Sequence, residues 1–478
     1  MNIIIIKDKN KLRELTKYPI KIIIIMFKKI EAWTLYLTVV CAIIITISFG
    51  ALVRQELVGL QKFGFVSKTA LFLAEIPMNL KQMYLNFTDK GTRLSIKDNI
   101  HADKPRFKRF ITTDRNELLF LARYDGDIKR SVVEIVDLNN FLILHAYKPD
   151  VNEINSKTDT NREEFARLKI DDAPSRFEFR HPLLLNDGGI LSQSDSPLFK
   201  IDFCSNLMWV NDVDMFHHSN EIDFEGNYWV PSEIFPYAID AYLVGSEWGK
   251  FKDDSITKIS PNGKILYQKS VTEILLENNY KHLIFGQSNF IMDPIHLNDI
   301  QPVLKDGIYW KKDDVFLSIK NMSLIMHFRP STNEIINMIT GPFFQQHDVD
   351  IISNKEISIF NNNRLKTIDG DKITNNEIVI YNFETQIFSK KFNEQLKAEK
   401  VATEGQGLSH ILEDGSMMVE EQDQGRILFF NSNGELEWEY VNKAKNGMHY
   451  IVTWSRIIEN ENLIENIKEK IKNKQCTN

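Results

Sequence analysis

This sequence has few cysteines, lacks common enzyme motifs and carries no excess of positive charge. Its 478 residues include three cysteines, and because Cys41 lies in an apolar run, Cys204 and Cys476 are too few for a disulfide framework. No CxxC pair is present to hold a structural metal ion. The net charge of −7 provides no general attraction to phosphate polymers, so we expect no nucleic acid partner.

Several familiar catalytic motifs are also missing. The chain contains no GxGxxG, P-loop, GxSxG or HExxH sequence, so dinucleotide, nucleoside triphosphate, serine hydrolase and zincin chemistries have no anchor. The apolar fraction of 43% is large enough for an extensive core. The length is compatible with about three ordinary domains or with one large β-rich domain.

One uncharged run near the N-terminus predicts a membrane span. Residues 32–53 carry no charge, and as a helix they would extend about 33 Å, enough to cross a bilayer core. Eight basic and three acidic residues precede this run, which predicts a cytoplasmic N-terminus. We expect an uncleaved signal anchor in the inner (cytoplasmic) membrane, with the C-terminal domain in the periplasm or outside. A cleaved signal peptide, a buried helix and a start at Met26 are the alternatives.

From about residue 110 the sequence is typical of an all-β repeat. Short β-rich runs alternate with Asp-Gly, Asn-Gly and Asn-Asn turns at intervals of about ten residues. One unit covers residues 118–142, and five more begin with a histidine: His181, His218, His296, His347 and His410. Units of this length with about four strands each are typical of propeller blades. We therefore expect an all-β, six-bladed β-propeller with histidines directed at its central channel.

These patterns divide the chain into five expected parts. Apolar positions at helical spacing, interrupted by Gly64 and Pro77, predict a helical neck between the membrane span and the propeller. The parts are a basic cytoplasmic N-terminus (residues 1–31), a transmembrane signal anchor (32–53), the helical neck (54–109), the β-propeller (110–460) and a polar C-terminal tail (461–478).

Three motifs mark the later units of the repeat. They are His296-Leu-Asn298 with the strand at residues 315–325, Gln346-His347-Asp348 with residues 339–345 and 357–364, and Gly407-Leu-Ser-His410 with residues 414–440. These stretches resemble bacterial arylsulfotransferases, enzymes that move a sulfuryl group between phenols without a nucleotide donor. The resemblance covers about residues 180–460. Asn361 stands where that family often has Asp, and the third motif is the loosest match.

The resemblance implies a ping-pong reaction through a sulfohistidine. A neutral imidazole attacks the sulfur of an aryl sulfate, and a second phenol then takes the sulfuryl group. The implied catalytic residues are His410, His347, His296 and Arg364, and the implied substrate-binding residues are Asn298 and His218. His410 is the first candidate for the nucleophile and His347 is its main rival, while Arg364 would donate paired hydrogen bonds to the sulfuryl oxygens. The implied partners are a small aryl sulfate and a phenol, with no cofactor or metal.

Other interpretations remain open on the sequence alone. A histidine at a strand end is often purely structural, and the clustered histidines with Asp299, Asp348 and Asp350 also suit a transition metal ion. A propeller can also serve as a non-catalytic periplasmic binding or scaffolding module. Convergence of the implied catalytic residues on one sulfate-sized site favours the enzyme, and dispersed positions favour the module.

Overall fold

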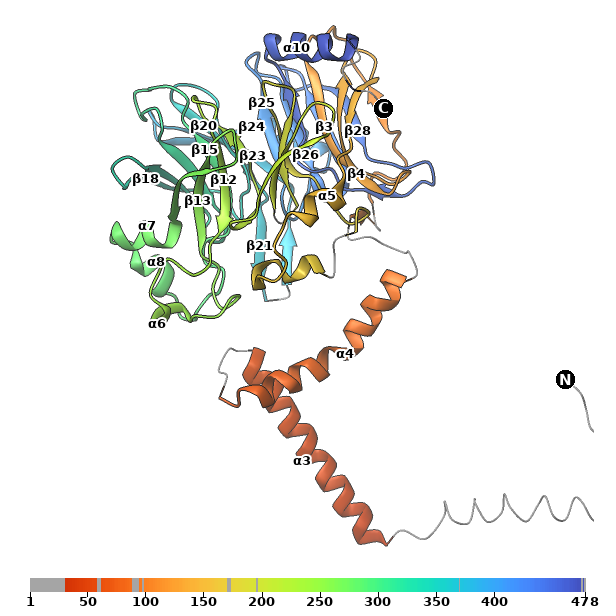
Figure 1. The fold of residues 1–478 in the computed structure, drawn as a ribbon, viewed down its shortest axis with the longest axis vertical. Helices are drawn as coiled ribbons and strands as arrows, with labels where there is room; N and C mark the ends of the chain where they lie inside the picture. The colour runs from red at the N-terminus through yellow and green to blue at the C-terminus, as the bar shows by residue number, and fades with distance from the viewer. Residues whose placement is uncertain are drawn as a thin grey trace, which may run out of the picture. The chain divides into compact units, whose positions relative to one another are not determined.

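The computed structural model describes residues 31–57, 62–87, 94–96, 99–169, 173–194, 197–368, 370–473 and 476. The chain divides into two compact units, Met1–Lys90 and Gly91–Asn478, which we describe in turn (Figure 1). Apart from Glu31, the predicted basic N-terminal segment and the alternative start at Met26 lie outside the described residues.

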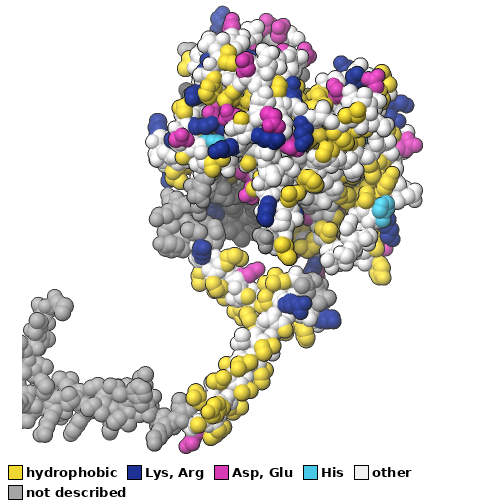
Figure 2. Space-filling model, turned by 180° about the vertical axis from the view of Figure 1, so that it is seen from behind, with side chains coloured by type: hydrophobic (Ala, Val, Ile, Leu, Met, Phe, Trp, Pro, Cys, Tyr) yellow, Lys and Arg dark blue, Asp and Glu magenta, His cyan; other side chains and the backbone are white. Residues whose placement is uncertain are grey.

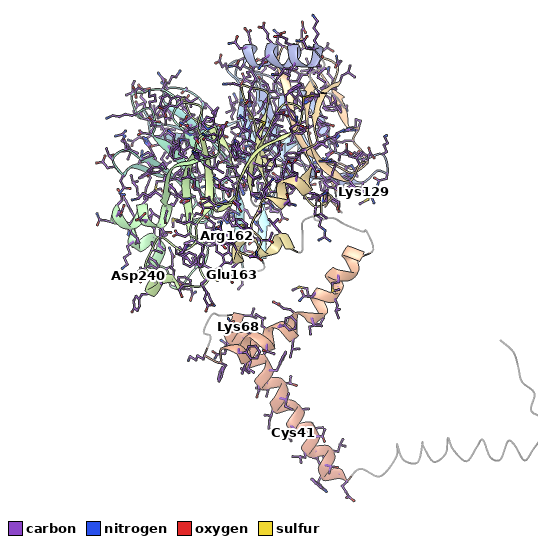
Figure 3. All side chains as sticks on the ribbon, viewed as in Figure 1. Cys41, Lys68, Lys129, Arg162, Glu163 and Asp240 are labelled. Carbon is purple, nitrogen blue, oxygen red and sulfur yellow. A yellow bond between two sulfur atoms is a disulfide. The ribbon has the colours of Figure 1, made fainter. Side chains whose placement is uncertain are left out.

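The first unit contains two helices, α3 (Ala32–Leu57) and α4 (Phe65–Phe87). No side chain of α3 is buried, and Figure 2 shows hydrophobic side chains along its length. The helix is long and apolar enough to cross a membrane, as the sequence predicted. Cys41, the one free cysteine among the described residues, is exposed on it (Figure 3). Pro77 lies inside α4, where its missing N–H removes one helical hydrogen bond.

The second unit is a six-bladed β-propeller, which confirms the predicted fold. Blade 1 consists of β30 (Arg456–Ile458), β3 (Leu118–Asp125), β4 (Arg130–Asp137) and β5 (Ile143–Tyr147). Blade 2 consists of β6 (Arg180–Leu184), β7 (Ile190–Gln193), β8 (Leu198–Ile201) and β9 (Leu207–Asn211). In blade 3, β10 (Met215–Phe216) and β11 (Glu221–Ile222) both pair with β12 (Tyr228–Glu233), which is followed by β13 (Asp254–Ile259) and β14 (Ile265–Ser270).

The remaining three blades follow the same antiparallel plan. Blade 4 consists of β15 (Leu297–Pro302), β16 (Val315–Ile319), β17 (Leu324–Arg329) and β18 (Glu334–Thr340). Blade 5 consists of β19 (Val349–Ile351), β20 (Glu356–Asn361), β23 (Glu377–Asn382) and β24 (Ile387–Lys391). Blade 6 consists of β25 (Leu408–Ile411), β26 (Met417–Glu421), β27 (Arg426–Phe430), β28 (Leu436–Val441) and the added strand β2 (Phe107–Arg109).

Short elements occupy the connections between these strands. Two further strand pairs are β1 (Ser95–Ile96) with β29 (His449–Tyr450) and β21 (Arg364–Thr367) with β22 (Gly370–Ile373). The helices are α5 (Val151–Ser156), η1 (Glu163–Lys169), α6 (Ala241–Val244), α7 (Val271–Glu277), α8 (Lys281–Phe285), η2 (Lys320–Met322), α9 (Asn393–Ala398), η3 (Gln422–Gln424) and α10 (Glu461–Lys472).

Each blade buries both of its faces against its neighbours. Strands β16 and β27 are buried at every position, instead of alternating between core and solvent. Leu118 and Leu119 are consecutive on β3, so they point to opposite faces of blade 1. Leu118 packs in the core shared with blade 2, and Leu119 packs in the core shared with blade 6. The propeller therefore has a separate apolar core at each junction between blades.

The ring of blades closes through its C-terminal strand. β30 pairs with β3, so that Ile458 lies opposite Leu118. The N-terminal strands β1 and β2 pair with β29 and β28 in turn. Residues 94–109, which the expected neck includes, thus contribute two strands to the propeller. The two ends of the propeller chain are interleaved, and this joins blade 6 to blade 1.

Helix α10 and a disulfide secure the closed end of the ring. The side chain of Asn460 caps α10 by accepting the N–H of Leu463. Ile464 and Ile467 of this helix are buried in the core between blades 1 and 2. After the helix, Cys476 forms a disulfide with Cys204, across 272 residues of sequence. The disulfide was not predicted, because ring closure rather than sequence spacing brings the two cysteines together.

Loss of this disulfide should destabilise the propeller. We expect Cys204→Ser to lower the free energy of unfolding by about 2–5 kcal/mol, because a bond that closes so long a loop strongly restricts the unfolded chain. Urea unfolding of the full chain in detergent, followed by tryptophan fluorescence, measures the change. Reductant should destabilise the wild type by the same amount and leave Cys204→Ser unaffected. A wild type that is insensitive to reductant would contradict the expectation.

Candidate active site

One residue near the start of each innermost strand has a left-handed backbone conformation. These residues, with their φ angles, are His181 (42°), His218 (58°), His296 (52°), Gln345 (54°), Gln406 (55°) and Trp454 (66°). A positive φ costs a residue other than glycine roughly 1 kcal/mol or more. Its recurrence in all six blades therefore marks a shared turn, and these turns bring side chains of different blades together.

A cavity of about 410 Å³ lies beside these turns. Its lining residues are Arg180, Met215, Phe216, His217, His218, Glu233, Lys252, Asp254, Asp293, His296, Lys320, His347, Gly405 and Gln406. The lining combines four imidazoles, three cationic side chains and three carboxyl groups. A small ligand with an anionic group would meet both positive charge and basic ring nitrogens here.

His218 lies in the middle of a histidine cluster. Its ring centroid is 5.9 Å from that of His181, 5.2 Å from that of His296 and 6.3 Å from that of His347. Burial, with smaller contributions from neighbouring charges, lowers the pKa of His181, His218 and His347 well below its usual value. These three imidazoles are therefore neutral near pH 7, the form that acts as a nucleophile or base.

Hydrogen bonds at Nδ1 orient the rings of His296 and His347. Nδ1 of His296 lies 2.7 Å from Oδ2 of Asp293, and Nδ1 of His347 lies 2.7 Å from Oδ1 of Asn362. Both oxygens accept hydrogen bonds, so each Nδ1 carries the proton and each Nε2 keeps its lone pair. Nε2 of His347 accepts the backbone N–H of Gln406 at 2.9 Å. Nucleophilic attack requires an unprotonated nitrogen, and Nε2 of His347 meets this requirement once the Gln406 N–H releases it.

Lys320 belongs to the same cluster, although it was not among the predicted site residues. Its Nζ lies 3.3 Å from Nε2 of His296, and its backbone N–H donates to the carbonyl of His296 at 3.2 Å. Burial, followed by the charge of Arg364, lowers the pKa of Lys320 to about 8. The one sequence signal for this residue is its place at the end of the apolar strand that follows the His-x-Asn motif.

Asn298 and Arg364 do not line the cavity. Asn298 is fully buried, and its Nδ2 donates to the carbonyl of Gln346 at 2.9 Å, so it supports the chain just before His347. Arg364 begins β21, where its Nη2 lies 2.6 Å from Oδ2 of Asp371. Its charge influences Lys320, as the pKa of that lysine indicates. Both residues therefore act next to the cavity rather than in its wall.

His410 also lies outside the cavity lining. It is on β25, and its Nε2 is 3.2 Å from Oε1 of Glu459. The left-handed turn of blade 6 is at Gln406, four residues before His410. Gln406 therefore has the position in blade 6 that His296 has in blade 4. A repeat aligned on its histidines cannot reveal this shift, because the shared feature is a backbone angle and not a residue type.

A second polar cluster lies among the innermost strands. Burial raises the pKa of Asp299 and Asp348 well above its usual value and that of Asp350 to about 6. Arg456 forms an ion pair with Glu221 nearby. Within the described residues, no group of three or more His, Cys, Asp or Glu side chains is arranged to hold a metal ion. Burial thus favours the protonated forms of these acids, and the charges of His410 and Arg456 oppose this effect at Asp350.

The fold and the cavity define a β-propeller protein with a polar, histidine-lined site. Residues 181–443 match the family described as Arylsulfotransferase (ASST), and this range contains His218, His296, Lys320 and His347. The match covers more than half of the chain, and the protein belongs to this family. The family predicted from the sequence motifs is therefore confirmed.

Several solved structures are distantly similar to the chain. A protein of unknown function from Bacteroides caccae is 12% identical, with a TM-score of 0.43 over 72% of this chain and 99% of that one. A streptogramin B lyase is 8% identical, with a TM-score of 0.36 over 74% and 97% of the two chains. Virginiamycin B lyase from Staphylococcus aureus is 10% identical, with a TM-score of 0.35 over 70% and 87%. Similarity at this level carries no argument, and no curated protein matches the chain.

Lys320 should make anion binding to the cavity depend on pH. Its ammonium form predominates below the pKa of about 8 and attracts an anion, whereas the neutral amine does not. We expect the affinity for sulfate, measured by calorimetry, to fall by up to about tenfold per pH unit above pH 8. Lys320→Gln should bind sulfate weakly at pH 7 and lose this dependence. Lys129→Gln, at an exposed lysine of blade 1 (Figure 3), should match the wild type. A wild-type affinity independent of pH would contradict the expectation.

Proposed function

We propose that this protein transfers a sulfuryl group from an aryl sulfate to a phenol through a sulfohistidine intermediate. The observation that carries the proposal is the convergence of three histidines and one lysine on a single cavity: His218, His296, His347 and Lys320. Membership of the arylsulfotransferase family supports the class of reaction. The neutral state of the buried rings supports nucleophilic catalysis by imidazole.

His347 is the proposed nucleophile. Oδ1 of Asn362 accepts a hydrogen bond from its Nδ1–H, so the lone pair is on Nε2. In the first step Nε2 attacks the sulfur, the N–S bond forms, and the bond from sulfur to the aryl oxygen breaks, leaving its electron pair on the phenolate. In the second step the oxygen of the acceptor phenol attacks the sulfur, and the N–S bond breaks with its pair returning to Nε2. The phenolic proton passes to a base in the cavity.

Gln406 controls access to the attacking nitrogen in this scheme. Its backbone N–H donates a hydrogen bond to the lone pair of His347 Nε2 at 2.9 Å, so the donor substrate must displace this N–H. Gly405 and Gly407 flank Gln406, but Asn362 Nδ2 donates to the Gln406 carbonyl at 2.7 Å and Gly405 N–H donates to Asp423 at 3.0 Å, so a shift of this segment has to break these hydrogen bonds. The released N–H then becomes a hydrogen-bond donor for a sulfuryl oxygen.

Lys320 is the proposed stabiliser of the negative charge on the sulfuryl oxygens. Its Nζ lies 3.3 Å from Nε2 of His296, which positions the ammonium group at the cavity, where its other N–H groups can donate to a sulfuryl oxygen. The sequence motifs assigned this role to Arg364 and the nucleophilic role to His410. The geometry favours Lys320 and His347 for these roles, and we propose that Arg364 acts on the site through the pKa of Lys320.

We also propose that the propeller lies in the periplasm, held at the inner membrane by α3. The basic residues before α3 favour a cytoplasmic N-terminus. The disulfide between Cys204 and Cys476 supports the same placement, because disulfides persist in oxidising compartments such as the periplasm. Cleavage after the helix would release the same oxidised propeller into that compartment.

Sulfuryl transfer by two histidine variants tests the assignment of the nucleophile. In detergent, with 4-nitrophenyl sulfate as donor and phenol as acceptor, we expect His347→Ala to lower kcat at least about 10³-fold, because the covalent step is lost. His410→Ala should remain within about threefold of the wild type. Mass spectrometry of protein trapped without acceptor should find the sulfuryl group on a peptide containing His347.

Two results would redirect these proposals. Loss of activity in His410→Ala, together with a sulfuryl group on the wild-type peptide that contains His410, would make His410 the nucleophile. A wild type that binds sulfate but transfers nothing across a panel of aryl sulfates would instead favour the non-catalytic binding module. Formation of the Cys204–Cys476 disulfide serves as the check on folding in every variant.

The cysteines report on the compartment of the propeller in living cells. We expect Cys204 and Cys476 to be protected from alkylation in the full chain, which should sediment with membranes. A chain that lacks residues 1–57 should remain in the cytoplasm with both thiols reactive. Gel shifts after alkylation with a maleimide polymer, with and without prior reduction, measure this difference. Reactive thiols in the full chain would argue against a periplasmic propeller.

A further inference from the structure

A chain of three side chains runs from the centre of the cavity into its wall. Nδ1 of His218 lies 2.7 Å from Nδ1 of His217, and Nε2 of His217 lies 3.2 Å from Oδ1 of Asp254. All three residues line the cavity. The transfer steps described above have no role for His217 or Asp254, so this arrangement requires its own explanation.

The contact between His217 and His218 depends on the strained turn of blade 3. In a regular strand, consecutive side chains point to opposite faces and do not meet. The positive φ of His218, 58°, breaks this alternation, and the two ring centroids lie 4.9 Å apart. The fold therefore retains a costly backbone conformation that places the two imidazoles in hydrogen-bond contact.

The hydrogen-bond directions follow from the carboxylate at the end of the chain. In neutral His217, Nε2 donates to the carboxylate of Asp254, and Nδ1 keeps its lone pair. Nδ1 of His218 must then donate across the 2.7 Å contact, which leaves Nε2 of His218 unprotonated. Within the described part of the chain, no hydrogen bond to another side chain or backbone group engages this Nε2. His218 therefore presents a base to the cavity.

Asp254 is held firmly by both of its oxygens. It begins β13, and its side chain is buried, with 3% exposure. Its Oδ2 accepts the backbone N–H of Leu297 at 2.7 Å, and Leu297 directly follows His296. One carboxylate thus orients His217 in blade 3 and fixes the start of the innermost strand of blade 4. Asp254 therefore links the segments that carry His217 and His296.

The other histidines of the cluster have different surroundings. Nε2 of His296 lies 3.3 Å from the amine of Lys320, and Nε2 of His347 is the proposed point of attack on sulfur. The ring of His181 stacks on Trp454 at a centroid distance of 3.8 Å. His218 is therefore the ring best placed to exchange a proton with a phenol bound at the sulfuryl site.

We propose that Asp254 and His217 act through His218 as a proton relay, which allows the enzyme to use acceptor phenols too weakly acidic to ionise unaided. This inference rests on the proposed sulfuryl transfer. As the phenol oxygen bonds to sulfur, its proton moves to Nε2 of His218, and the Nδ1 proton of His218 moves to Nδ1 of His217. Asp254 stabilises the resulting imidazolium. The reverse path delivers a proton to the phenolate that leaves the next aryl sulfate, so no proton is gained or lost over a cycle.

The acidity of the acceptor distinguishes this relay from a structural role. A simple phenol has a pKa of about 10, like tyrosine, and needs a base at neutral pH. A nitrophenol acidic enough to be ionised under the assay conditions needs none. His217 and Asp254 are positioning residues, since His218 alone meets the phenol. The loss of transfer rate on replacing either residue should therefore increase with the pKa of the acceptor phenol.

The test compares His217→Gln with the matched control His282→Gln, at an exposed histidine of α8, in the full chain in detergent. Two rates are measured: the burst of 4-nitrophenol from 4-nitrophenyl sulfate without acceptor, and steady-state transfer to phenols of graded acidity. For His217→Gln we expect a burst within about twofold of the wild type and transfer to phenol reduced about 10²-fold. Transfer to an ionised acceptor should fall by less than about threefold. His282→Gln should match the wild type throughout.

Asp254→Asn provides an independent second variant. The Asn oxygen can still accept the N–H of Leu297, but its NH₂ group would then face His217 and force the wrong tautomer on that ring. We expect the same dependence on acceptor acidity as in His217→Gln. The test of the relay then does not depend on the correct folding of a single variant.

The outcomes separate the relay from the proposed function. An equal loss for all acceptors, or no loss for any, overturns the relay while leaving sulfuryl transfer in place. A wild type that shows neither a burst nor turnover overturns the proposed function, and the relay with it. A loss that grows as the acceptor becomes less acidic, in both variants, supports the relay.

Discussion

Each blade of the propeller can cover its two apolar faces only with the blades on either side. Neighbouring residues of β3, Leu118 and Leu119, face two different cores for this reason. An open ring would leave one face of blade 1 and one face of blade 6 in water, so the core between these two blades depends on the pairing of β30 with β3. The same closure sets the circumference of the channel. It thereby sets the distances between the turns that carry the site.

The site itself is a product of backbone strain on a rigid support. Six left-handed residues, one in each blade, turn the chain at the beginning of the innermost strands. Such conformations persist only where the surrounding structure over-determines them, and the packed blades meet that condition. Rings from separate blades, such as His218 and His296, meet at 5.2 Å as a result. Burial then keeps His218 neutral, so the same packing that holds the geometry also sets the chemistry.

Local patterns in the sequence predicted the blades, the membrane helix and the histidine motifs, because turn residues and strand composition act over short distances. The motifs also led to His296 and His347, and the repeat led to His218; the structure gathers these three residues in one cavity. Lys320 and the disulfide were missed, because both depend on contacts that ring closure creates. His217 was missed for a related reason. Regular strand alternation points it away from His218, and only the positive φ of His218 reverses that expectation.

The position of the last strand in the sequence affects how the protein assembles during its synthesis. Trp454, whose ring stacks on His181, lies just before β30, and β30 follows every other strand of the propeller along the chain. A nascent polypeptide therefore lacks both the strand that closes the ring and part of the histidine environment until β30 has been synthesised. A product that ends before β30 has an open ring and no assembled site. Synthesis of all six blades is thus a condition for the chemistry of the site.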